Sequence, residues 1–171
     1  MIEIRAETPS DHDAVFTLLC RAFGGENEAR LILFLRSTPD FDPGLSLVAD
    51  HDGMIAGHIL FSPIAIETRD GASPALALAP LPVVPDLQRQ GIGEQLVRHG
   101  LERCRNRGHG VVVVLGDPAY YTRFGFSPAG ARHIKSPFPT PDEALMVLEL
   151  APGALSGIAG MVKYPAPFYS V

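Results

Sequence analysis

The chain has 171 residues, of which 46% are apolar and 19% charged, and its formal net charge is −5. This composition is typical of a folded globule, and a chain of this length buries about 70% of its unfolded surface. The negative charge gives no electrostatic footprint for nucleic acid or an anionic membrane, and no run of eighteen apolar residues could span a bilayer. We expect one domain over residues 1–171 in the cytoplasm, with no signal peptide and with Cys20 and Cys104 reduced.

The first half of the chain alternates strand and helix patterns. The predicted elements are a strand at 2–6, a helix that starts within 8–11 and ends at Gly24-Gly25, a helix from Glu26 to before Pro39, and three antiparallel strands at 45–49, 54–67 and 75–84. Asp50-His51-Asp52-Gly53 and Arg69-Asp70-Gly71 supply the turns between these strands. The second half predicts a helix at 91–107, a strand at 111–115, a short helix after Asp117, and strands at 144–150 and 158–164. Mixed strands with helices on both faces indicate an α/β layer architecture.

A glycine-containing turn joins the strand that ends at Val84 to the helix that follows. The turn carries Gln88, Gly91 and Gly93 in a Gln-x-x-Gly-x-Gly pattern. A helix N-terminus has backbone N–H groups without partners and partial positive charge, and glycine lets a ligand approach closely. The pattern therefore predicts a phosphate or pyrophosphate site. It is not a dinucleotide fingerprint, because position 96 is Leu, and the chain has no Gly-Lys pair for a P-loop.

A second motif follows the β-branched run Val111–Leu115, which predicts a strand buried on both faces. It reads Gly-Asp-Pro-Ala-Tyr-Tyr-Thr-Arg-Phe-Gly-Phe over residues 116–126. Asp117 can cap a short helix that has Pro118 at its first position, and Gly125 can end it.

These two motifs, in this order, resemble those of the GNAT superfamily of acyl-CoA N-acyltransferases, and more narrowly a bacterial subgroup with a Gly-Asp-Pro-x-Tyr-Tyr segment. The resemblance implies a mixed, mostly antiparallel twisted sheet of six to seven strands, flanked by about four helices and splayed between strands 4 and 5. It also implies transfer of an acetyl group from acetyl-CoA to a primary amine by direct attack, without a metal. Its specific motifs lie within residues 81–126.

The resemblance assigns roles to individual residues. In the family the pantetheine arm pairs with the splayed strand, and here Leu81 and Val83, set among three prolines, match those positions. The residues that match the family's cofactor loop are Gln88, Arg89, Gln90, Gly91, Ile92, Gly93 and Glu94. Tyr121 lies four residues before Gly125-Phe126 and matches the general acid that protonates the departing thiolate.

The general base and the acceptor stay open. Many family members have a Glu on the fourth strand, but residues 74–84 contain no acid. The remaining candidates are Glu26, Glu28, His58, Asp117 or a water chain. The alternatives to an acetyltransferase are a non-catalytic acyl-CoA sensor and a transferase for a longer acyl group. The acceptor could be an aminoglycoside, a polyamine, an amino acid or a peptide N-terminus, and a homodimer is open.

Overall fold

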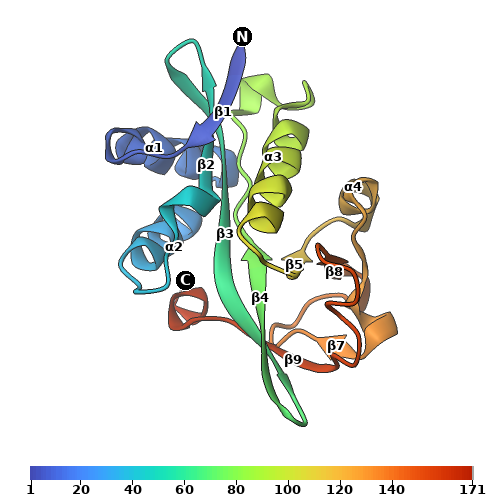
Figure 1. Ribbon diagram of the computed structural model, residues 1–171. Helices are drawn as coiled ribbons and strands as arrows, with labels where there is room; N and C mark the ends of the chain where they lie inside the picture. Colours follow the sequence, from blue (N-terminus) through green and yellow to red (C-terminus); the bar gives the residue numbers. More distant parts are fainter. Residues whose placement is uncertain (171) are drawn as a thin grey trace. The chain divides into compact units, whose positions relative to one another are not determined.

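The computed structural model describes residues 1–170, which fold into two compact units (Figure 1). The first unit comprises Met1–Ser62, Ala79–Arg103 and residues 166–170, and the second comprises Pro63–Leu78 and Cys104–Pro165. The α-helices are α1 (His12–Phe23), α2 (Asn27–Arg36), α3 (Ile92–Asn106) and α4 (Pro118–Tyr121). The strands are β1 (Ile2–Ala6), β2 (Ser46–His51), β3 (Met54–Thr68), β4 (Gly71–Leu78), β5 (Val111–Leu115), β6 (Ser127–Pro128), β7 (Ile134–Lys135), β8 (Leu145–Glu149) and β9 (Gly160–Lys163). Within the described range no helix has the length and apolarity needed to cross a membrane. The prediction of one domain stays a prediction.

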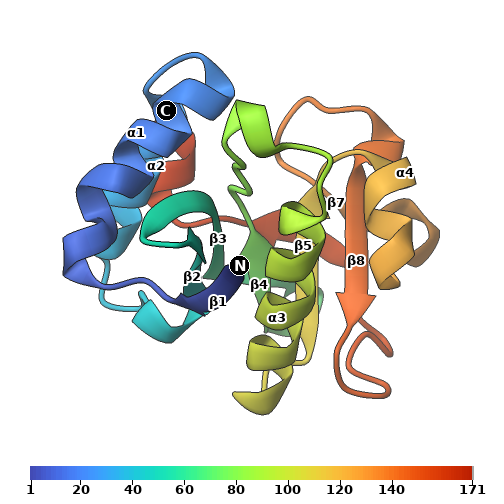
Figure 2. The ribbon, with the colours of Figure 1, turned by 90° about the horizontal axis from the view of Figure 1, so that it is seen from above.

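The first unit is built on the antiparallel strands β1, β2 and the first part of β3. Helices α1 and α2 cover one face of these strands, and α3 lies on the other face (Figure 2). The apolar cluster under α1 and α2 consists of Val15, Leu19, Ala29, Leu31, Ile32, Leu35, Val48 and Leu60. Because side chains alternate along a strand, Leu60 faces this cluster while its neighbours on β3 face α3.

Two buried glycines set how closely α3 approaches its side of the sheet. A Cβ on Gly57 would lie 2.9 Å from Cδ1 of Leu96, and a Cβ on Gly100 would lie 2.4 Å from the ring of Phe61. Neither position has room for a larger residue without movement of the helix or the strand. These contacts fix the start of α3, and with it the turn that carries Gly91.

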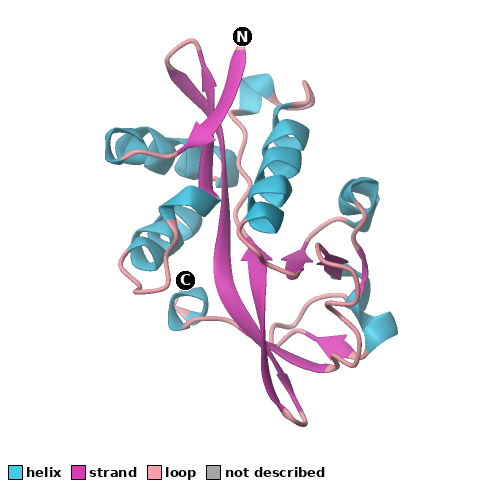
Figure 3. Ribbon diagram, in the orientation of Figure 1, coloured by secondary structure: helices cyan, strands magenta, loops and turns pink. Residues whose placement is uncertain are grey.

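The segment 79–84 differs from the sequence prediction. A single strand over 75–84 is wrong at its end, because β4 stops at Leu78 and the chain then runs beside the first part of β3 (Figure 3). Pro80 and Pro82 have no N–H, so they cannot complete a ladder of hydrogen bonds. A shorter set of bonds to β3 remains, and it includes a bridge between Gly57 and Val83.

In the second unit the hydrogen-bonded order is β3, β4, β5, β8 and β6, with β9 on β3 and β7 on β9. The strands β4 and β5 are parallel and pair only at Leu76–Val112 and Ala77–Val113, while β5 and β8 are antiparallel over five pairs. Val111–Val114 are all buried, as the β-branched run predicts. The sequence does not predict β6 and β7, because strands of two residues carry no alternation pattern.

Candidate functional site

The turn before α3 has the backbone of an anion site. Arg89 has φ of 61° and Gly91 has φ of 87°, so both lie in the left-handed region. The first bond of the helix runs from the N–H of Gln95 to the carbonyl of Gly91, and the N–H groups of Ile92 and Gly93 donate to no backbone group in residues 1–170. A Cβ on Gly91 would have no heavy atom within 4 Å. The turn therefore presents unpartnered donors at the positive end of a 15-residue helix, with open space above Gly91.

The segment 79–84 presents a second set of unpartnered donors. On the side toward β3, the carbonyls of Pro80 and Pro82 accept from Leu60 and His58, and the N–H of Val84 donates to Ala56. Leu81 and Val83 alternate with these residues, and their N–H groups donate to nothing in the part of the chain that the structure describes. Such an edge can pair with another extended group.

The side chain of Gln88 joins the turn to this edge. Its Nε2 donates to the carbonyl of Val83 at 3.2 Å. Arg89 is exposed, and the carboxylate of Glu94 is held by Arg98 at 3.0 Å. The predicted cofactor residues from 81 to 94 therefore lie together in the first unit, and the hydrogen bond of Gln88 links the turn to the segment 79–84.

Tyr121 lies in the second unit, at the end of α4. Asp117 caps this helix by accepting from the N–H of Ala119 at 2.9 Å, and Gly125 ends the following turn with φ of 96°. Burial raises the pKa of the Tyr121 phenol above its ordinary value, so the group is protonated at neutral pH. Its hydroxyl makes no hydrogen bond to any residue from 1 to 170.

The four candidate bases have different surroundings. Glu26 forms an ion pair with Arg30 at 2.9 Å, and Asp117 is engaged as the cap of α4. His58 is fully buried. Glu28 is half-buried, and its carboxylate has no hydrogen bond or ion pair with the described residues. Of the three carboxylates, Glu28 is therefore the one without a hydrogen bond or ion pair among the described residues, and it lies in the first turn of α2.

His58 belongs to a buried polar cluster that the sequence does not reveal. Its Nε2 lies 2.9 Å from Oγ of Ser46, and this hydroxyl donates its one proton to Glu7, which is also held by Arg36. Because Ser46 can then only accept from His58, the imidazole carries its proton on Nε2. Nδ1 keeps a lone pair, is buried and has no partner among residues 1–170. The members come from four elements or their flanks, far apart in sequence, so no local spacing signals the cluster.

This cluster makes stability depend on pH. Burial lowers the pKa of His58 to about 4 from 6.5, with Glu7 opposing the change and Arg36 and His12 adding to it. The unfolded chain then binds the proton more tightly, so the stabilisation is complete above pH 6.5 and is lost as pH falls toward 4, by roughly 3 kcal/mol in total. Urea unfolding between pH 7.5 and 4.5 should show this loss, and His58→Gln should flatten it. An equal slope in the His58→Gln variant and the natural protein would contradict the assignment.

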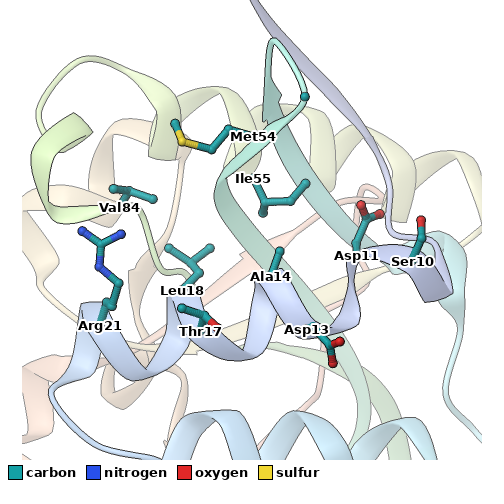
Figure 4. Close-up of a pocket in the computed structure, with 11 residues that line it drawn as sticks. Ser10, Asp11, Asp13, Ala14, Thr17, Leu18, Arg21, Met54, Ile55 and Val84 are labelled. Atoms are coloured by element: carbon teal, nitrogen blue, oxygen red, sulfur yellow. The ribbon is translucent and has the colours of Figure 1, made fainter.

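A pocket of about 550 Å³ lies in the first unit, and Val84, the last residue of the segment 79–84, is part of its lining (Figure 4). Leu18, Ile55 and Val84 form an apolar wall, and Arg21 lies at the end next to Val84. Asp11, at the other end, is engaged by Arg5 at 2.8 Å, which holds the pKa of that carboxyl well below its usual range. The pocket therefore offers an apolar wall and a guanidinium next to the end of the predicted cofactor edge. No group of three or more His, Cys, Asp or Glu side chains within residues 1–170 is arranged to hold a metal ion.

Comparison with known proteins gives the family. A model of acetyltransferase (GNAT) domains matches residues 3–129. The uncharacterized N-acetyltransferase YhbS of Escherichia coli K12 is 36% identical over 165 residues, which are 96% of this chain and 97% of YhbS. The uncharacterized N-acetyltransferase YjhQ of the same strain is 38% identical over 135 residues, 78% of this chain and 75% of YjhQ.

Two solved structures extend this likeness to the whole fold. The crystal structure of E. coli YhbS in complex with CoA matches 98% of this chain and 92% of its own, at 36% identity and a TM-score of 0.91. A GNAT acetyltransferase from Brucella melitensis, in complex with acetyl-CoA, matches 98% of each chain at 32% identity and a TM-score of 0.81. The predicted α/β fold is confirmed, with its mixed, mostly antiparallel sheet and the parallel pair β4–β5. The chain belongs to the GNAT family of N-acetyltransferases.

Proposed function

We propose that this N-acetyltransferase binds acetyl-CoA along Leu81 and Val83 and over the turn 88–94, and transfers the acetyl group to a primary amine. The observation that carries the proposal is the pair of open backbone surfaces in the first unit: an unpaired strand edge and an open helix N-terminus, braced by Gln88. An extended pantetheine arm suits the first surface and a pyrophosphate suits the second. The solved relatives, described in complex with CoA and acetyl-CoA, support the same ligand.

The residues of the chain then have defined roles. An N–H of Leu81 or Val83 polarises the thioester carbonyl by donating to its oxygen. When the amine nitrogen bonds to the carbonyl carbon and the carbon–sulfur bond breaks, Tyr121 donates its phenolic proton to the thiolate sulfur. A base takes one proton from the attacking nitrogen. The phenol of Tyr121 is protonated at neutral pH, so its proton is available when the thiolate forms.

We assign the base to Glu28, directly or through water, because its half-buried carboxylate has no partner in the described chain. Glu28→Gln should lower kcat about tenfold or more at pH 7. The loss should shrink toward pH 10, because a primary amine with a pKa near 10 becomes neutral without help. Glu26→Gln, two residues earlier in the chain, is the matched control. A uniform loss at every pH, or the same loss in the control, would contradict this role.

The turnover assay follows the release of the CoA thiol from acetyl-CoA in the presence of one acceptor at a time. Spermidine, phenylalanine, kanamycin and a peptide with a free N-terminus represent the four classes of amine. We expect thiol release that depends on the amine for at least one class. Tight binding of acetyl-CoA without amine-dependent release in any class would favour a non-catalytic acyl-CoA sensor. Equal rates with butyryl-CoA would count against preference for acetyl.

A further inference from the structure

Gly116 has no assigned role, although it begins the second sequence motif. It follows β5 directly, and its N–H donates to the carbonyl of Ala144 at 2.9 Å. Its φ is not among the left-handed values in the chain, so its backbone conformation is open to other residues. Conformation therefore does not explain why this position is glycine.

Space explains it. A Cβ on residue 116 would lie 2.4 Å from Cε2 of Tyr121, 2.9 Å from Cδ2 and 3.4 Å from Cζ. The edge of the phenol ring that leads to the hydroxyl thus lies directly on the backbone of Gly116. Any side chain would push the ring away, because a Cβ contact under 3.0 Å is not tolerated.

The ring of Tyr121 also packs against two aromatic rings, and we call the site formed by Gly116 and these rings its seat. The ring of Tyr120 meets it edge to face at 5.0 Å between centroids, and Phe126 does so at 5.6 Å. The helix α4 has only four residues, so it cannot fix a side chain by its own length. The position of the Tyr121 hydroxyl is therefore set by Gly116 on one side and by aromatic rings on the others.

We propose that Gly116 is a positioning residue of the acetyl-transfer reaction: its missing side chain seats the ring of Tyr121 so that the hydroxyl reaches the leaving sulfur. The proposal rests on the role of Tyr121 given under Proposed function. It assigns Gly116 no contact with substrate. An error of about 1 Å in the place of a catalytic group costs on the order of 100-fold in rate, so the seat has a measurable effect.

The test compares Gly116→Ala with Gly130→Ala, which adds the same methyl group in the second unit where no atom lies within 4 Å. We expect Gly116→Ala to lower kcat 10- to 100-fold, to leave the Kd of acetyl-CoA within twofold, and to add no loss to Tyr121→Phe. Unchanged kcat, or a loss that multiplies that of Tyr121→Phe, would overturn the proposal. Unchanged kcat in Tyr121→Phe itself would instead overturn the proposed acid.

A spectroscopic readout separates seating from general damage. The chain has four tyrosines and no tryptophan, so ¹³Cζ-tyrosine NMR gives four signals, and Tyr121→Phe identifies one of them. Moving the ring out of its seat should bring the phenol pKa of Tyr121 down toward 10, while the signals of Tyr164 and Tyr169 stay in place. An unmoved Tyr121 signal would overturn the proposal. If Gly116→Ala does not fold, adding Tyr121→Leu should restore folding, and failure to restore it would also overturn the seat.

Discussion

Tyr121→Phe is expected to lower kcat about 100-fold, because a positioned general acid contributes on the order of 100- to 10,000-fold. The Kd of acetyl-CoA should not change, because the ring and its contacts with Tyr120 and Phe126 are kept. The measurement is steady-state thiol release together with calorimetric binding of acetyl-CoA. The kcat that remains in Tyr121→Phe should be higher for acceptor amines that can expel the thiolate without help from an acid.

Tyr120→Phe is the matched control, since it removes one hydroxyl from the adjacent residue of α4. We expect its kcat to stay within about threefold of the natural protein. Equal rates for Tyr121→Phe and the natural protein would exclude Tyr121 as the proton donor. Loss of acetyl-CoA binding in Tyr121→Phe would instead make the hydroxyl a binding group.

Gly91→Val should weaken acetyl-CoA binding on the order of 100-fold, about 2.7 kcal/mol. The residue has φ of 87°, which a β-branched side chain rarely adopts, so the direction of the neighbouring N–H groups changes. The valine also projects into the open space above the turn, where a Cβ would meet no protein atom. The measurement is isothermal titration with acetyl-CoA, with circular dichroism to confirm that the total helix content is unchanged.

Gly108→Val separates the ligand effect from backbone strain. Gly108 follows the other end of α3, has φ of 85° and has equally open surroundings. The two variants should lose similar stability, but only Gly91→Val should lose affinity. Similar affinity losses in both, or none in Gly91→Val, would contradict the place of the pyrophosphate.

The parts of the site that local chemistry determines could be predicted from the sequence. Gly91 sets a turn that only a few residues can adopt, and Asp117 with Pro118 starts a helix through its own hydrogen bonds. The buried strand Val111–Leu115 follows from its β-branched run. These features depend on neighbours within a few positions, so the local sequence is sufficient to predict them.

The rest depends on contacts between distant residues. The pairing of Pro82 with His58 moves the segment 79–84 away from the strand that the apolar pattern predicts. The cluster of Glu7, Ser46 and His58 joins β2, β3 and the end of β1, and no periodicity links them. Gly116 is visible in the sequence, but its reason, the ring of Tyr121, requires the packed structure.

The most direct test of the account is calorimetric titration of the protein with acetyl-CoA and, in parallel, with NAD and ATP. The open edge at Leu81 and Val83 and the open turn at Gly91 predict one site that binds acetyl-CoA and CoA, at least 100-fold more tightly than NAD or ATP. Equal binding of all the nucleotides would reduce the turn to a general phosphate site. No binding of acetyl-CoA would contradict the proposed function at its first step.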